Sequence, residues 1–135
     1  LAKNLELDWK ASMIKYSPSD TDQLRETMVR RSKQGAELMK LPVHLDPDDV
    51  EIVSGFDGGA YAAPTDAAFE AIHLVAQTEA VILDPNYTGK SMSALIDRVR
   101  SGGFTEDDTV LFLHSGGLPQ VFAFNEELAA WSPSD

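Results

Sequence analysis

The 135-residue sequence predicts an α/β fold with three layers, in which helices flank a mostly parallel sheet of three to four strands. Short apolar runs alternate with longer helical patterns, as in parallel sheets. The apolar run 80–83 also ends in a polar loop, after which a helix begins. Its apolar residues recur at i, i+3, i+4 and i+7: Met92, Leu95, Ile96 and Val99. So few strands indicate an incomplete part of a larger doubly wound fold, and we expect one domain over residues 1–135.

The first elements are a strand and a long helix. Residues 11–16 form a short apolar segment, and a polar turn follows them. Asp20, with Gln23 three residues later, resembles a capping box, so we predict a helix from there to about Lys40, before Pro42. Its expected buried side is Leu24, Met28, Gly35, Leu38 and Met39.

The middle of the chain repeats this order. Residues 49–56 are a candidate strand, and residues 57–64 a long, flexible loop. Thr65 is a plausible N-cap of the next helix. The apolar positions expected in that helix are Phe69, Ile72, Val75 and Ala76.

The last elements are bounded by glycines. Gly102 and Gly103 stop the helix that carries Met92. Residues 109–114 are the most apolar candidate strand, and a Ser-Gly-Gly turn ends it. The tail after Phe124 is weakly patterned, and Pro133 makes its end irregular.

The composition restricts the class of partner and the location. Eleven basic and 22 acidic residues give a net charge of -11, which argues against binding nucleic acid or an anionic membrane surface. The chain has no cysteine, and no apolar run approaches the ~18 residues of a membrane span. We expect a cytoplasmic protein. Because Leu1 begins inside a helical pattern, we expect a copy of part of something longer.

Hydroxyl groups occur in three loops that follow candidate strands. Tyr61, Tyr87 and Ser115 lie in these loops, which open on one edge of a parallel sheet. Phenolic hydroxyls can exchange protons or donate hydrogen bonds to a carboxylate. Gly116 and Gly117 let the backbone approach a flat ligand closely. The pattern predicts a small-molecule site, although such residues also serve in packing and in turns.

The amino-acid sequences of these loops resemble the motifs of one family of cofactor-dependent enzymes. Residues 84–92 read DPNYTGKSM, residues 110–119 read VLFLHSGGLP, and Tyr61 is followed by Pro64. These segments resemble motifs of the pyridoxal-phosphate-dependent family of D-cysteine desulfhydrase and 1-aminocyclopropane-1-carboxylate deaminase. That family belongs to the tryptophan-synthase β-like group, fold type II. The resemblance is clearest over residues 50–124, and it makes residues 1–135 similar to the C-terminal part of the large domain.

The resemblance implies roles for individual residues. Tyr87 and Tyr61 match catalytic tyrosines that face the substrate. Ser115 matches a hydroxyl near the pyridine nitrogen of the cofactor, and Gly116 and Thr88 are expected to bind the cofactor with it. The deaminase branch has a glutamate where this chain has Thr88, which points toward the desulfhydrase-like branch.

The chain departs from the family in several places. Alanines replace the glycines on both sides of Tyr61, and Asn86 replaces an apolar residue. The Schiff-base lysine and the glycine-rich phosphate cup lie upstream of the matched region in the family, and neither motif is found here. Lys90 is expected to be solvated or structural, and Asp84 to hold its loop by turn chemistry.

Two hypotheses follow from these features. The chain is part of a pyridoxal-phosphate enzyme that converts a small amino acid into ammonia and a 2-oxo acid, inactive alone and forming a homodimer or an assembly with a missing N-terminal part. Alternatively, it is a non-catalytic α/β module that binds a partner or a small anion. His44, His73 and His114 share no metal-ligand spacing, and we expect no metal site.

Overall fold

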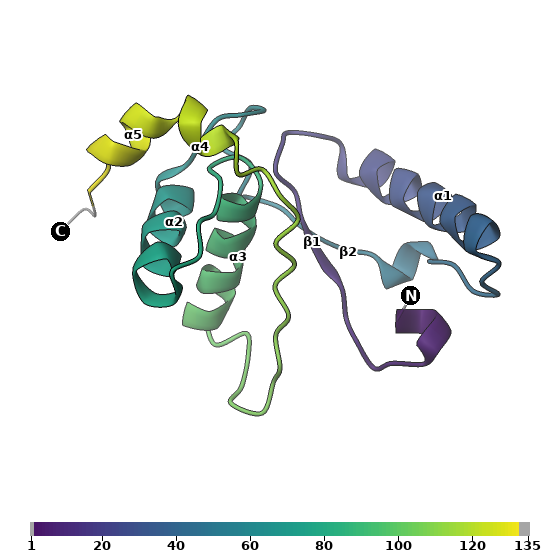
Figure 1. The fold of residues 1–135 in the computed structure, drawn as a ribbon. Coiled ribbons are helices and arrows are strands. Elements are labelled where there is room, and N and C mark those ends of the chain that lie inside the picture. The colour runs from purple at the N-terminus through teal and green to yellow at the C-terminus, as the bar shows by residue number, and fades with distance from the viewer. Residues whose placement is uncertain (1, 133–135) are drawn as a thin grey trace. The chain divides into compact units, whose positions relative to one another are not determined.

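A computed structural model describes residues 2–132 (Figure 1). The contacts of the chain fall into two compact units: residues 2–13 with 19–53, and residues 14–18 with 54–132. The expectation of one domain over residues 1–135 stays a prediction. The predictions for Leu1 and Pro133 lie outside the described residues. Within residues 2–132, no helix is both long and apolar enough to cross a membrane.

The first unit contains a small sheet and one long helix. Its elements are η1 (Ala2–Leu5), β1 (Ser12–Ile14), α1 (Thr21–Met39), η2 (Pro47–Asp49) and β2 (Glu51–Val53). Strands β1 and β2 pair in a parallel two-stranded sheet. Two short strands and a connecting helix make a βαβ arrangement, which confirms the predicted α/β class.

Helix α1 begins where the sequence predicts, but its buried face is shorter than expected. The Asp20 carboxylate accepts a hydrogen bond of 2.8 Å from the backbone N–H of Gln23, as an N-cap should. Ala36 is buried, whereas Leu38 and Met39 are 85% and 63% exposed, so their predicted burial is wrong. A 19-residue helix is about 28 Å long, and strands of three residues span only about 10 Å. The helix therefore extends beyond its short sheet.

The second unit is built on two packed helices, α2 (Asp66–Glu79) and α3 (Thr88–Arg100). Thr65 caps α2 through the N–H of Ala68 at 3.1 Å, as predicted. The short helices α4 (Gln120–Ala123) and α5 (Asn125–Ala130) follow. The buried core consists of Phe69, Ile72, Val75 and Leu83, and Met92, Phe112, Leu128 and Trp131 pack against it.

The face of α3 that is buried differs from the predicted one. Val99 is 56% exposed, and Leu95 and Ile96 are only half-buried. The buried positions are instead small or polar: Thr88, Gly89, Lys90, Ser93 and Ala94. A Cβ at Gly89 would lie 3.2 Å from the Ile72 side chain and 2.6 Å from the Asp84 carbonyl oxygen. The close approach to α2 and to the preceding loop therefore selects small residues.

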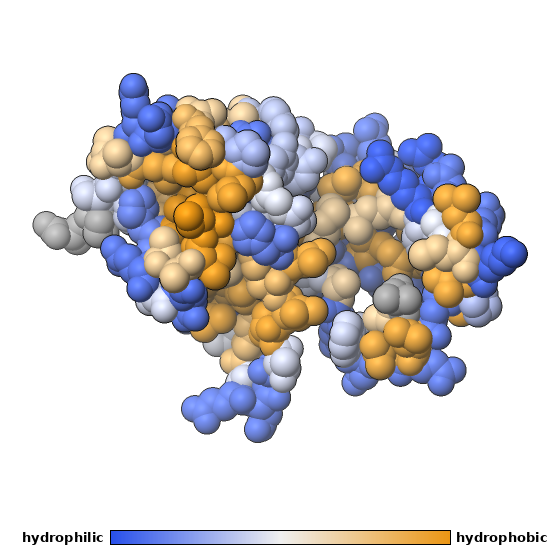
Figure 2. Space-filling view, in the orientation of Figure 1, coloured by the Kyte–Doolittle hydropathy of each residue, from blue (hydrophilic) through white to orange (hydrophobic). Residues whose placement is uncertain are grey.

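Two predicted strands lack a ladder partner in the described part of the chain. Neither residues 80–83 nor residues 109–114 form a strand there. Leu111 and Leu113 are 79% and 80% exposed, although a central parallel strand is covered on both faces. Figure 2 shows apolar side chains exposed over the second unit. The apolar pattern records a preference for burial, but a strand also needs a neighbouring backbone.

An ion pair between α2 and α3 gives a first prediction. Arg100 donates two hydrogen bonds to Glu70, of 2.7 and 3.2 Å, and this guanidinium lowers the pKa of the Glu70 carboxyl. The folded-state pKa is below the unfolded one, so the stabilisation is present above the unfolded pKa and is lost as the pH falls through the folded pKa. Glu70→Gln should lower the midpoint of thermal unfolding slightly at neutral pH. It should also remove the part of the stability that the wild type loses as the pH falls. Glu106→Gln, at an exposed turn, is the control, and equal effects of the two variants would contradict the prediction.

Candidate functional site

A buried carboxylate organises the loop between residue 83 and helix α3. Asp84 is fully buried and accepts hydrogen bonds of 2.8 Å from the backbone N–H groups of Asn86, Tyr87 and Thr88. These amides open the helix, where a negative charge is favourable because the helix dipole is positive there. The expectation that Asp84 holds its loop is confirmed.

Thr88 completes this arrangement instead of facing open space. Its hydroxyl donates to Asp84 Oδ1 at 2.7 Å and accepts from the Asp84 backbone N–H at 2.8 Å, and the side chain is 1% exposed. The hydroxyl is therefore used inside the loop. The cofactor contact predicted for Thr88 stays a prediction, and the geometry assigns the residue a structural role in addition.

Lys90 is structural and fully buried, not solvated. Its ammonium donates to the carbonyl oxygens of Asp57, at 2.6 Å, and Tyr16, at 3.2 Å. Burial lowers its pKa, while the charges of Asp57 and Asp84 act in the opposite direction. The ammonium thus joins α3 to two loops of the same unit. The sequence signal that could have indicated this was the Gly-Lys-Ser start of the helix, where a lysine is unfavourable unless it is held by acceptors.

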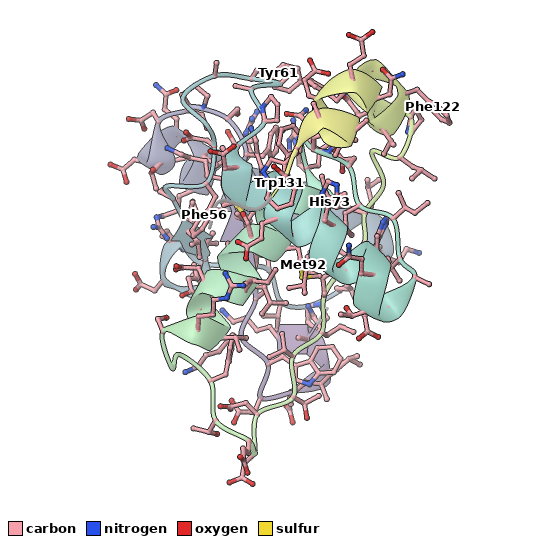
Figure 3. All side chains as sticks on the ribbon, turned by 90° about the vertical axis from the view of Figure 1, so that its left-hand side faces the viewer. Phe56, Tyr61, His73, Met92, Phe122 and Trp131 are labelled. Atoms are coloured by element: carbon pink, nitrogen blue, oxygen red, sulfur yellow. The ribbon has the colours of Figure 1, made fainter. Side chains whose placement is uncertain are left out.

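The structure brings the two predicted catalytic tyrosines together. The hydroxyls of Tyr61 and Tyr87 are hydrogen-bonded, and their ring centroids lie 6.4 Å apart. Figure 3 shows Tyr61 on a loop at one end of the unit, and this side chain is 59% exposed. Tyr16, which the sequence analysis did not single out, packs edge-on against Tyr87 with centroids 5.1 Å apart.

The hydrogen bond with Tyr61 raises the pKa of Tyr87 above the ordinary value of a tyrosine, and burial adds to this. The hydrogen bond thus favours the protonated form of the Tyr87 phenol. Such a group can donate a proton or a hydrogen bond, and it is a poor base. The pair thus forms an exposed donor site at the edge of the unit.

The Ser-Gly-Gly turn meets the same buried carboxylate. Gly117, with φ 92°, lies so close that an added Cβ would be 2.4 Å from Asp84 Oδ1. Ser115 is exposed, and Gly116, with φ 130°, faces open space. The two sequence motifs therefore converge at Asp84. The predicted cofactor contacts of Ser115 and Gly116 stay predictions.

The two glycines of this turn allow a matched comparison. Both have positive φ, so alanine is strained at either position, but only Gly117→Ala also collides with the carboxylate. Gly116→Ala should cost about 1 kcal/mol of unfolding free energy, and Gly117→Ala should cost several times as much. Denaturant unfolding measures both. Equal losses would show that the contact between Gly117 and Asp84 is unimportant.

The histidines have structural surroundings. His114 Nε2 is hydrogen-bonded to the Ile82 carbonyl oxygen at 3.0 Å. His73 bonds to the Phe69 carbonyl oxygen at 2.9 Å and stacks on Trp131, with centroids 4.7 Å apart (Figure 3). Residues 2–132 contain no cluster of three or more His, Cys, Asp or Glu that could hold a metal ion.

The geometry can be compared with known proteins. The family model described as pyridoxal-phosphate dependent enzyme matches residues 2–116 of this chain. This chain belongs to the pyridoxal-phosphate-dependent enzyme family. The family resemblance of the loops is thereby confirmed, and the tyrosine pair and the Ser-Gly-Gly turn are features of a member of this enzyme family.

Individual relatives within the family are deaminases by name. A 1-aminocyclopropane-1-carboxylate deaminase of Ralstonia nicotianae is 39% identical over 104 residues, or 77% of this chain and 31% of the relative. One from Pseudomonas syringae pv. tomato is 38% identical over the same length. A crystal structure of an ACC deaminase homologue matches with a TM-score of 0.78 and 28% identity, covering 93% of this chain and 37% of that one. The chain spans about a third of the length of these relatives.

Proposed function

We propose that this chain is the substrate-side portion of a pyridoxal-phosphate-dependent deaminase or desulfhydrase. The enzyme would take a small amino acid, D-cysteine or one like 1-aminocyclopropane-1-carboxylate, and give ammonia and a 2-oxo acid. The hydrogen-bonded hydroxyls of Tyr61 and Tyr87 carry the proposal, because they present proton donors at an exposed edge in a chain of this family. Its cytoplasmic location and assembly as a homodimer, or with an N-terminal part, belong to the same proposal.

The Ser-Gly-Gly turn has the space and the hydrogen-bonding group that one side of a pyridoxal-phosphate site needs. Gly116 leaves open space where a Cβ would stand, and the neighbouring Ser115 offers an uncharged hydroxyl suited to a pyridine nitrogen. Lys90 does not fit as the anchoring lysine, because its ammonium is buried and holds two carbonyl oxygens. Bound pyridoxal phosphate would supply a sink for the electrons left behind when the α-proton departs.

The residues of the chain would act on the substrate as proton donors and positioning groups. One hydroxyl of the Tyr61–Tyr87 pair donates to the other, so the pair keeps one further proton for a hydrogen bond or a proton transfer to the substrate. The contact between the two hydroxyls orients the donating group. At position 88 the side chain is turned to Asp84, and threonine brings no carboxylate beside Tyr87. This supports a desulfhydrase-like preference for D-cysteine.

The test compares two substrates in a protein that carries this chain. We expect the reading frame upstream of Leu1 to encode a lysine and a glycine-rich loop. The protein expressed from that frame, supplied with pyridoxal phosphate, should form 2-oxo acid and ammonia, with sulfide from D-cysteine. Faster turnover of 1-aminocyclopropane-1-carboxylate would overturn the substrate preference, and turnover of neither would favour the non-catalytic binding module. The 135-residue chain alone should form no product.

A further inference from the structure

Asn86 connects the two tyrosine loops within the second unit. Its side chain is 1% exposed, and its Oδ1 accepts a hydrogen bond of 3.1 Å from the backbone N–H of Ala62. Because an N–H group can only donate, this contact fixes which end of the amide faces Ala62. The backbone N–H of Asn86 is itself held by the Asp84 carboxylate at 2.8 Å. The loop that carries Tyr61 is therefore attached to the buried carboxylate through Asn86.

Ala62, the residue that Asn86 holds, has a strained backbone conformation. Ala62 has φ 55°, the left-handed conformation, which costs an alanine roughly 1 kcal/mol or more. A residue in this conformation persists only where its surroundings hold it. Tyr61 is the residue next to Ala62, so a change of φ at Ala62 would swing the loop and move the Tyr61 hydroxyl away from Tyr87. The hydrogen bond from Asn86 is positioned to prevent this.

The other end of the Asn86 amide has no partner in the structure. Its Nδ2 is buried and makes no hydrogen bond, which costs about 1–3 kcal/mol relative to a satisfied donor. An apolar side chain would avoid this unsatisfied donor but would leave the Ala62 N–H without its acceptor.

We propose that Asn86 is a positioning residue that sets the Tyr61–Tyr87 hydroxyl pair by holding Ala62 through its Oδ1. The proposal adds a positioning residue to the site. Its catalytic consequence rests on the proposed function, whereas its structural part does not.

The structural part is tested by NMR on the chain without cofactor. With labelled tyrosines, a cross-peak between the Tyr61 and Tyr87 rings reports the pair. Asn86→Leu, of similar volume, should lose this cross-peak while the chain stays folded, and Asn86→Asp, which keeps an oxygen acceptor for Ala62, should retain it. Should Asn86→Leu fail to fold, Asn86→Ser, whose shorter side chain cannot reach Ala62, takes its place. An unchanged cross-peak in a folded variant without the acceptor overturns the proposal.

A double-variant cycle tests the catalytic part in the longer, cofactor-loaded protein. Asn86→Leu alone should lower kcat about tenfold or more, with a smaller change in KM, since a misplaced group can cost up to about a hundredfold. In a Tyr61→Phe background, Asn86→Leu should add less than about threefold, because the pair is already lost. Full additivity would show that Asn86 does not act through Tyr61. Absence of any activity would count against the proposed function and leave the NMR result to decide on Asn86.

Discussion

Replacing Tyr87 by phenylalanine, in a cofactor-loaded protein that carries this chain, should lower kcat by about 100- to 10,000-fold. The ring and its packing would remain, and only the hydroxyl that pairs with Tyr61 would be lost. The proposed role needs the protonated hydroxyl, whose pKa is raised by the hydrogen bond with Tyr61, so the wild-type rate should fall as the pH rises toward that pKa. Steady-state kinetics across pH measure both effects.

Tyr16 provides the matched control for this experiment. It is a tyrosine of the same unit that packs edge-on against Tyr87, and it holds Lys90 through its backbone carbonyl oxygen. Tyr16→Phe deletes the same atom and keeps both contacts, so its kcat should change less than about threefold. If Tyr87→Phe and Tyr16→Phe had equally small effects, Tyr87 would have no catalytic role.

Replacing Asp84 by alanine should have the largest effect on stability. The change removes the acceptor of three backbone N–H groups and of the Thr88 hydroxyl, all in a buried site. Buried donors left without partners cost about 1–3 kcal/mol each, although the losses are not additive. We expect the free energy of unfolding to fall by at least about 3 kcal/mol, measured by denaturant titration.

The control for Asp84 is an exposed aspartate. Asp107→Ala, in the turn before residues 109–114, should change the free energy of unfolding by less than about 0.5 kcal/mol. Asp84→Asn should fall between the two, because its amide oxygen can still accept some of the bonds. A loss below about 1 kcal/mol for Asp84→Ala would mean that the loop does not depend on its carboxylate.

Local signals in the sequence were sufficient for the helices and their caps. Asp20 and Thr65 bond to the backbone N–H three residues later, and Asp84 holds its loop, because capping depends on a few neighbouring residues. The predicted strand at residues 109–114 depends on a partner far away in sequence. Leu111 and Leu113 are apolar, as a buried strand requires, and yet they are exposed. No local pattern can specify which backbone would pair with them.

The sequence predicts which hydroxyl-bearing residues belong to the candidate site, but it does not predict the contacts that hold them in place. Tyr61 and Tyr87 were found by motif, and the structure brings them into contact over 26 positions of sequence. The burial of Lys90, the attachment of Asn86 to Ala62 and the collision that excludes a side chain at Gly117 all depend on contacts between distant segments. Sequence spacing carries no information about such contacts without a related structure.

The central claim is that the Tyr61–Tyr87 pair forms the substrate side of a pyridoxal-phosphate site. The most direct measurement is a crystal structure of the longer protein with pyridoxal phosphate and an unreactive analogue of D-cysteine. The account predicts the Tyr87 hydroxyl at about 3 Å from the bound analogue, with Ser115 at the pyridine nitrogen and the anchoring lysine outside residues 2–132. An analogue bound away from both tyrosines, or a cofactor anchored on Lys90, would contradict it.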